Sequence, residues 1–574
     1  MRSDFGTIVT LECEGYRLLE IEGQEYVCCR EPKNSAIRAE LWEYLTDSIS
    51  SDQVSNFGHR YPVAFLADNI NAVKRVQHKD KAKLVKYLAQ AGERMRKSWA
   101  ERKAKGLVEM SDIPRAFPID SEVVFDDGEE FVAGVVKTVE QEHSWMGGVY
   151  WSVKLQVVHA IRGIPGQGLY QTKVRGFHGL IPMKDLPLRF PTKADMKKLE
   201  TRGARFAAFC QPGTYLSYKG ELTQPSWWSS RTYRADGRVV VDPVSMERTD
   251  PETWRDCINL CGIQVDQDEE RARSRSTKKV EIAKKDYWRC VPFLYGFSLA
   301  VKQWGKLDLD GMTEVKWRDD AWEKLVLDPE EKDLIHSLVK FHGGGFTDII
   351  EGKGGGCIFL LHGKPGWGKT ASAEAVAELL HKPLYSVGVG ELGTNTDVLE
   401  KSLRQILDVA TIWDAVILLD EADIFLEKRD EHNIVRNAMV GVFLRLLEYH
   451  NGVLFLTTNR VTDIDEAFYS RISVALHYRA EGKAEKIWTN LLGAAGLDPK
   501  WAVSMSKYDV NGRQIKNAIR MAQTLARSKD RKVRVEDLER SAAATIRFQT
   551  EMASSRKAKE NRAYAKAKRA ASGE

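Results

Sequence analysis

The fold is decided by the stretch Cys357-Ile-Phe-Leu-Leu-His-Gly-Lys-Pro-Gly-Trp-Gly-Lys-Thr370, which continues into Ala371-Ser-Ala-Glu-Ala-Val-Ala-Glu-Leu-Leu380. It opens with an apolar run that predicts a buried strand and closes with residues typical of a helix. Between them lies a GxxxxGK[ST] loop, Gly363–Thr370, in the strand–loop–helix order that a phosphate-binding loop requires. The sequence therefore predicts a parallel α/β fold with a phosphate site at the start of the helix.

The residue types within this loop fit phosphate chemistry. Gly366 and Gly368 allow the backbone to turn so that successive N–H groups face phosphate oxygens. Lys369 is expected to reach the β- and γ-phosphates of a nucleotide, and the Thr370 hydroxyl is expected to bind Mg²⁺. The other predicted nucleotide contacts are Gly363, Pro365, Trp367 and Ala371.

A second apolar strand, Ala415-Val-Ile-Leu-Leu-Asp-Glu421, ends in two acidic residues. Because sheet ligands bind at the carboxyl ends of parallel strands, both acids are expected at that edge. Asp420 would hold Mg²⁺ through its water shell, and Glu421 would orient and polarise the attacking water. A helix N-cap would explain Asp420 alone, but it leaves Glu421 and the apolar run unexplained.

Together with Leu456-Thr-Thr-Asn459, these motifs resemble the AAA+ ATPases, in their AAA-type branch, over about residues 326–547. The resemblance implies ATP and Mg²⁺ as cofactors and ATP hydrolysis as the activity. It implies an α/β P-loop NTPase fold, a parallel sheet plus a small helical lid, preceded here by a β-rich α+β region. Several longer sequence segments are similar to a narrower group, the largely uncharacterised filamentous-fungal AAA ATPases with a β-rich N-terminal region. These segments are Gly352–Gly356, Leu384–Gly393, Phe443–Tyr449 and Thr457–Val461, with Tyr218–Gly220, Gly237–Asp242 and Gly296–Leu299 upstream.

The resemblance also implies roles for three further polar residues. Asn459 resembles the first sensor, which helps to place the water beside Glu421. Arg471 resembles the arginine finger that reaches the nucleotide of the next subunit, which implies a homo-oligomeric, hexameric ring. Arg513 lies where the second sensor contacts the γ-phosphate. Both arginines also fit a plainer interpretation as solvated charges.

One departure concerns the central pore of ring-forming unfoldases, where the family places an aromatic residue after the second strand. The matching stretch here, Glu391-Leu-Gly-Thr-Asn-Thr-Asp397, contains no aromatic residue. A pore that grips a polypeptide is therefore in doubt, although the Leu-Gly pair could still touch a substrate weakly.

Composition excludes several classes of protein. The chain has 574 residues, of which 43% are hydrophobic and 29% charged, as in soluble multidomain proteins. The apolar runs are too short to span a membrane, and Met1–Gly6 does not start a secretory signal. Eight cysteines are too few for a disulfide scaffold, so we expect reduced thiols and an intracellular location, cytoplasmic or nuclear.

Five regions are predicted along the chain. They are a mixed region 1–110 with a basic helix, a β-rich recognition domain 115–325 with a flexible insertion at about 263–280, a large ATPase subdomain 326–480, a helical lid 481–547 and a basic tail 548–574. In the basic helix, Leu84, Tyr87, Leu88 and Ala91 recur at helical spacing, so one face is expected to pack. Tryptophans of the β-rich domain are expected in core and edge packing rather than in a ligand platform: Trp227, Trp228, Trp304, Trp317 and Trp322.

The function predicted from these features is a Mg²⁺-dependent ATPase ring that remodels an unknown protein or complex recruited by the β-rich domain. A nucleotide-gated interaction scaffold with little hydrolysis is the first alternative. A nucleic-acid-associated motor is the second, suggested by a tail with seven Lys or Arg against three acids. The same tail also fits a nuclear-import signal or a solvated end without a partner.

Overall fold

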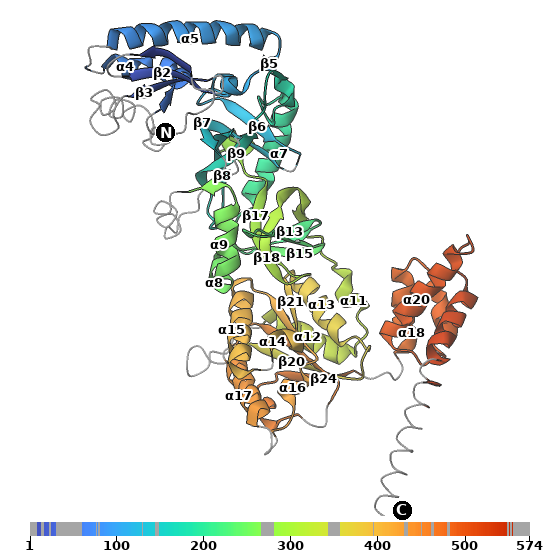
Figure 1. Cartoon of the computed structure of the whole chain (residues 1–574). Helices are drawn as coiled ribbons and strands as arrows, with labels where there is room; N and C mark the ends of the chain where they lie inside the picture. Colours follow the sequence, from blue (N-terminus) through green and yellow to red (C-terminus); the bar gives the residue numbers. More distant parts are fainter. Residues whose placement is uncertain are drawn as a thin grey trace, which may run out of the picture.

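The structure is a computed structural model (Figure 1). It describes residues 8–12, 16–21, 24–29, 60–75, 77, 81–128, 130–143, 149–265, 281–341, 356–393, 395–429, 434–448, 450–460, 464–478, 483–547, 550–551 and 554.

The first part of the described chain is an antiparallel sheet in the order β1-β2-β3-β4 (Ile8–Glu12, Tyr16–Ile21, Gln24–Cys29, Arg60–Pro62). It is followed by helices α3 (Val63–Asp68), α4 (Ile70–Arg75) and the long α5 (Lys81–Ala104). Helix α5 buries Leu84, Leu88 and Ala91, as the sequence predicts, while Tyr87 is half-buried.

The next part is an antiparallel sheet, here called the β6–β16 sheet, in the order β11-β6-β7-β8-β9-β16. Its strands are Leu188–Arg189, Glu122–Asp126, Phe131–His143, Val149–His159, Gly166–Arg175 and Ile263–Gln264, and helix α7 (Lys193–Phe209) packs against it. A short pair, β5 (Leu107–Val108) and β10 (Ile181–Pro182), accompanies this sheet.

Strand β16 corrects one expectation. Its residues Ile263 and Gln264 were predicted to begin a flexible insertion, but they pair with β9 because Ile263 is buried in the core. The remaining residues of that predicted insertion, 266–280, lie outside the described part of the chain.

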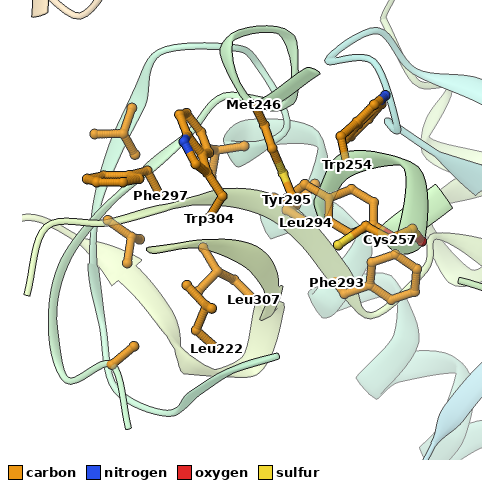
Figure 2. Close-up of a cluster of buried hydrophobic side chains, with 14 of the residues drawn as sticks. Leu222, Met246, Trp254, Cys257, Phe293, Leu294, Tyr295, Phe297, Trp304 and Leu307 are labelled. Atoms are coloured by element: carbon orange, nitrogen blue, oxygen red, sulfur yellow. Dashed lines mark hydrogen bonds between the residues drawn. The ribbon is translucent and has the colours of Figure 1, made fainter. Parts of the chain in front are cut away.

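A second antiparallel sheet, the β12–β19 sheet, has the order β14-β13-β18-β17-β15-β12-β19. Its strands are Arg231–Arg234, Glu221–Gln224, Gln303–Asp308, Phe293–Ser298, Gly237–Val241, Thr214–Tyr218 and Met312–Glu314. Helices α8 (Pro243–Thr249) and α9 (Pro251–Leu260) cover it. Figure 2 shows the resulting core, in which Met246 and Trp254 of the helices meet Tyr295 of β17 and Trp304 of β18.

Downstream, the chain forms a parallel sheet, the β20–β24 sheet, in the order β21-β22-β23-β20-β24. Its strands are Leu384–Gly388, Val416–Asp420, Val453–Thr458, Cys357–Gly363 and Val474–Tyr478. The accompanying helices are α11 (Asp320–Lys324), α12 (Pro329–Phe341), α13 (Lys369–Leu380), α14 (Val389–Leu392), α15 (Thr396–Ile412), α16 (Asp423–Leu426) and α17 (Ile434–Glu448). The predicted parallel α/β fold is confirmed, and its β-rich upstream region is present as antiparallel sheets.

The last described part is helical, with α18 (Ala484–Ala494), α19 (Ala502–Met505), α20 (Gly512–Arg527) and a further helical stretch at 535–547. It has its own core around Trp488, Ile515 and Leu538. Nearly all of the predicted basic tail lies outside the described residues. Of the helices that the structure describes, none combines the length and apolar character that crossing a membrane requires.

The tryptophans divide into two groups. Trp304 and Trp322 are buried, and Trp317 stacks on His381 with ring centroids 4.8 Å apart, as packing predicts. For Trp227 and Trp228 the packing prediction is wrong, because their side chains are 71% and 97% exposed. Both lie in the tip that joins β13 to β14, the end strand of its sheet, so they project beyond the packed layer.

Candidate nucleotide site

A cavity of about 900 Å³ lies where the carboxyl ends of β20, β22 and β23 meet the start of α13 and the helical lid. Parallel strands bring these ends to one edge, so motifs far apart in the sequence converge there. The predicted residues that line it are Pro365, Gly366, Trp367, Gly368, Lys369, Thr370, Ala371, Asp420, Glu421, Asn459 and Arg513.

The loop has the backbone conformation that its glycines predict. Gly366 and Gly368 have φ values of +84° and +97°, a region that residues with side chains rarely adopt. A Cβ at Gly366 would also lie 2.6 Å from the side chain of Asn511 in the lid. Gly368 is the N-cap of α13, and no side chain within the described residues caps that end. The first N–H groups of α13 are thus left for an anionic ligand.

Lys369 is a buried cation at the centre of the site, with 7% of its surface exposed. Its Nζ donates to the carbonyl oxygens of Gly363 (2.7 Å) and Lys364 (3.1 Å) and to Oδ1 of Asn459 (2.9 Å). Burial lowers the pKa of Lys369 and Arg513 adds to this, whereas Asp420 opposes it. Gly363 therefore contributes through its carbonyl oxygen, and Asn459 contacts the lysine directly.

Asp420 is held by two threonines. The Thr370 hydroxyl lies 3.4 Å from Oδ2 of Asp420 and 3.5 Å from Oδ1. Thr457 donates its hydroxyl hydrogen to Oδ1 of Asp420, and its oxygen accepts the N–H of Glu421 at 2.9 Å. A hydroxyl and a carboxylate facing one cavity form an oxygen donor set of the kind that Mg²⁺ prefers, so these residues fit the predicted ion.

Sequence reasoning missed Thr457. Its signal is its place in the motif: Thr457 is the second-last residue of β23, two residues before Asn459, which follows the end of the strand. The register of the sheet also places Leu456 opposite Leu419, so that the next residues, Thr457 and Asp420, are neighbours.

Glu421 occupies a strained position. Its φ of +58° lies in the left-handed region, which costs a residue with a side chain about 1–3 kcal/mol. The bond to Thr457 and the bond from Ala422 N–H to the Thr457 carbonyl hold this conformation. Such strain persists where surrounding contacts impose it, and here it turns the chain at the mouth of the cavity.

The lid reaches the phosphate loop through its helix α20. Asn511 caps α20 by accepting the N–H of Gln514 (3.0 Å), and its Nδ2 lies 3.4 Å from the Pro365 carbonyl. This contact places Arg513, in the first turn of α20, at the cavity. Asn511 was not singled out in the sequence, although an Asn directly before a helix is a typical N-cap.

Arg471 lies outside the cavity lining. Its Nη2 pairs with Glu448 at 3.2 Å, its Nη1 donates to the Ala467 carbonyl at 2.9 Å, and 27% of its side chain is exposed. The structure therefore does not bring Arg471 to the nucleotide site of its own chain, and its role as a finger for a neighbouring subunit stays a prediction.

In the segment at the position of the pore loop, the leucine is buried, whereas Glu391, Asn395 and Asp397 are exposed. Leu392 ends helix α14 and is 1% exposed, so it is unavailable for the weak substrate contact considered from the sequence. Glu391 forms an ion pair with Lys302, in the turn between β17 and β18.

Comparisons with known proteins agree with the geometry. Residues 359–479 match the family model described as ATPase family associated with various cellular activities (AAA). Two Arabidopsis thaliana proteins, AAA-ATPase At3g28610 and the mitochondrial AAA-ATPase At3g28570, are 25% and 27% identical over 183 and 176 residues. Each alignment covers 27% of this chain and little more than a third of the relative (37% and 38%).

A Saccharomyces cerevisiae protein, Ribosome biogenesis ATPase RIX7, is 31% identical over 120 residues, which is 19% of this chain and 14% of that protein. The crystal structure of the FIGL-1 AAA domain in complex with ADP aligns with 39% of this chain and 82% of that chain, at 22% identity and a TM-score of 0.32. The narrower resemblance to a filamentous-fungal group stays a prediction. The residues that match the family model, 359–479, are therefore a domain of the AAA+ superfamily of ATPases.

Proposed function

We propose that the chain binds ATP with Mg²⁺ and hydrolyses it, working as a homo-oligomeric ring that remodels a protein partner. The observation that carries the nucleotide part is the convergence of Lys369, Thr370, Asp420, Glu421 and Arg513 on one cavity. These residues come from the phosphate loop, a neighbouring strand and the lid, and phosphate binding alone would not require the two acids.

Each residue has a distinct task in this proposal. Lys369 exchanges its bonds to loop carbonyls for bonds to phosphate oxygens, and Arg513 adds positive charge from the lid side. Thr370 and Asp420 would hold Mg²⁺, which supplies charge stabilisation at the phosphates when bound. Glu421 accepts a hydrogen bond from the attacking water and aligns it, with Asn459 nearby on Lys369.

Glu421→Gln is the decisive variant because it keeps the shape of the side chain and removes its basicity. We expect ATP affinity, measured by calorimetry, to stay within about twofold of the wild type, and turnover to fall by about 100-fold or more. Glu466→Gln is the matched control, since Glu466 is an exposed carboxylate in the short 3-10 helix Glu466–Phe468 between β23 and β24. Turnover at the wild-type rate in Glu421→Gln would refute the proposal for Glu421.

The ring is tested separately through Arg471. Steady-state hydrolysis is measured against protein concentration, with the particle mass recorded at each point. Activity per chain that rises as rings form, and that is lost in Arg471→Ala without loss of the rings, supports a finger supplied by a neighbour. Activity that is independent of assembly removes that role.

A nucleotide-gated scaffold is the second candidate, and the inward packing of Leu392 favours it. A scaffold would bind ATP and change its assembly state without multiple turnovers. Rings that form with ATP but hydrolyse nothing at any concentration would favour the scaffold over the remodelling ATPase.

A further inference from the structure

The β12–β19 sheet lies directly against the β20–β24 sheet and its helices (Figure 1). The buried core is continuous across the boundary, where Phe297 and Trp304 of the upstream sheet pack on Tyr385 and Trp413 with ring centroids 5.5 to 5.9 Å apart. The Trp413 indole N–H also donates to the buried carboxylate of Asp242 at 2.7 Å. The upstream sheet is therefore packed against the ATPase core as a fixed part of it.

One contact in this interface reaches the phosphate-loop helix itself. Arg238 of β15 pairs with Glu378 of α13, with Nη2 and Oε1 2.8 Å apart. The other oxygen of Glu378 accepts the backbone N–H of Arg318 at 2.9 Å. The Arg238 guanidinium is held in turn over the rings of Tyr215 (5.5 Å) and Trp317 (5.0 Å). Both charged side chains are largely covered, at 25% and 20% exposure, so water competes only partly for the pair.

Because of where Glu378 lies along α13, its ion pair with Arg238 can restrict the position of the whole helix. The helix starts with Lys369 and Thr370 and ends at Leu380, so Glu378 lies in its last turn. A helix of this length is a rigid rod of about 18 Å, and fixing one end restricts the other. A cation at the carboxyl end of a helix is also favoured by the helix dipole. Arg238 itself lines the cavity that holds the phosphate loop.

We propose that Arg238 is a positioning residue for the nucleotide site: the upstream sheet holds the phosphate-loop helix in its binding position through the Arg238–Glu378 pair. The proposal rests on the proposed nucleotide binding. It goes further by making ATP affinity depend on a region about 130 residues upstream of the phosphate loop. Arg238 acts through α13, so its loss should weaken ATP binding more than it slows hydrolysis at saturation.

The test is Arg238→Met, which keeps an unbranched stem against Tyr215 and Trp317 but removes the charge. We expect its ATP dissociation constant and KM to rise about 5- to 10-fold, with kcat within about twofold of the wild type. Arg238→Lys should restore part of the affinity. Arg234→Met is the matched control, because Arg234 lies on the same sheet, is exposed and forms its ion pair with Asp236, away from α13.

A double-mutant cycle separates the pair from general damage. Glu378→Gln should reproduce the loss of Arg238→Met, and the double variant should be no weaker than either single one. Additive losses, or unchanged affinity in Arg238→Met and Glu378→Gln, would overturn the proposal. If Arg238→Met does not fold, Glu378→Gln alone decides by its affinity.

Measuring ATP binding by the wild type distinguishes a failure of the proposed function from a failure of the positioning role proposed for Arg238. A wild-type chain that binds no ATP overturns the proposed function. The role of the Arg238–Glu378 pair in holding α13 is then judged from hydrogen exchange of the α13 amides, which should become faster in Arg238→Met than in Arg234→Met. Equal protection of the α13 amides in both variants overturns the positioning role of Arg238, whatever the result for nucleotide binding.

Discussion

Thr457→Val tests the geometry of the site most directly. The substitution keeps the shape of a β-branched side chain but removes a hydroxyl that donates to Asp420 and accepts the N–H of Glu421. Thr457 is 1% exposed, so water cannot easily replace the lost partner. Both acids of the site therefore lose one restraint through a single change, while the fold around them stays intact.

The magnitude follows from the hydrogen bond to the carboxylate. A bond to a charged group contributes about 2 kcal/mol, and the valine leaves the Glu421 N–H without its acceptor. If the loss falls mainly on the transition state, kcat should drop about 30-fold, because each 1.36 kcal/mol is a factor of ten. ATP affinity should change less, since Lys369 and the loop backbone are untouched.

The assay is steady-state ATP hydrolysis at saturating Mg²⁺ and ATP, combined with binding by calorimetry and a thermal melt. Thr172→Val is the control: Thr172 is also a buried strand threonine, at 2% exposure, but its hydroxyl donates to the backbone of Val153 in the β6–β16 sheet. A Thr457→Val variant whose kcat stays within twofold of Thr172→Val would refute the reasoning.

Three further outcomes are expected. Trp413→Phe removes the donor to the buried Asp242 carboxylate and should cost about 2–3 kcal/mol of unfolding free energy, measured by urea denaturation; a loss below about 0.5 kcal/mol would contradict it. Burial lowers the pKa of His450 to about 4. Because the unfolded chain binds this proton below about pH 6.5 and the folded chain does not, stability should fall between pH 6.5 and 4, by about 2 kcal/mol at pH 5. His450→Gln should remove this component of the pH dependence, and an unchanged slope would count against it. Trp227→Ser combined with Trp228→Ser should leave the unfolding free energy within about 0.5 kcal/mol, since both rings are exposed; a larger loss in the same denaturation assay would mean that they pack.

The sequence was informative where function depends on short spacing. The loop around Lys369 and the strand ending at Asp420 are each recognisable from a pattern of a few residues. Their convergence could then be predicted from the parallel fold. Thr457 and Arg238 could not be found in this way, because their partners lie 36 and 140 residues away in the chain. Such contacts depend on the register between strands and on how whole sheets pack together, and a local sequence pattern predicts neither.

Trp227 and Trp228 show the opposite failure. An aromatic pair beside a strand usually packs, but packing needs a second layer over that spot, and the tip between β13 and β14 extends past the end of its sheet. The sequence predicts the turn and its aromatic residues, but it does not show whether a neighbouring helix or strand extends far enough to cover them. Exposure of a side chain is thus a property of the assembled layers rather than of its local segment.

The buried bond between Trp413 and Asp242 bears on how this protein can be divided for expression. A fragment that begins near residue 326 would leave the Trp413 indole and the Tyr385 ring facing water, together with Glu378 and Glu391 without their basic partners. It would expose an aromatic surface patch that favours aggregation, and its phosphate-loop helix would lose the ion pair at its carboxyl end. The stretch that a family model recognises, residues 359–479, is therefore smaller than the unit that must be produced as one piece.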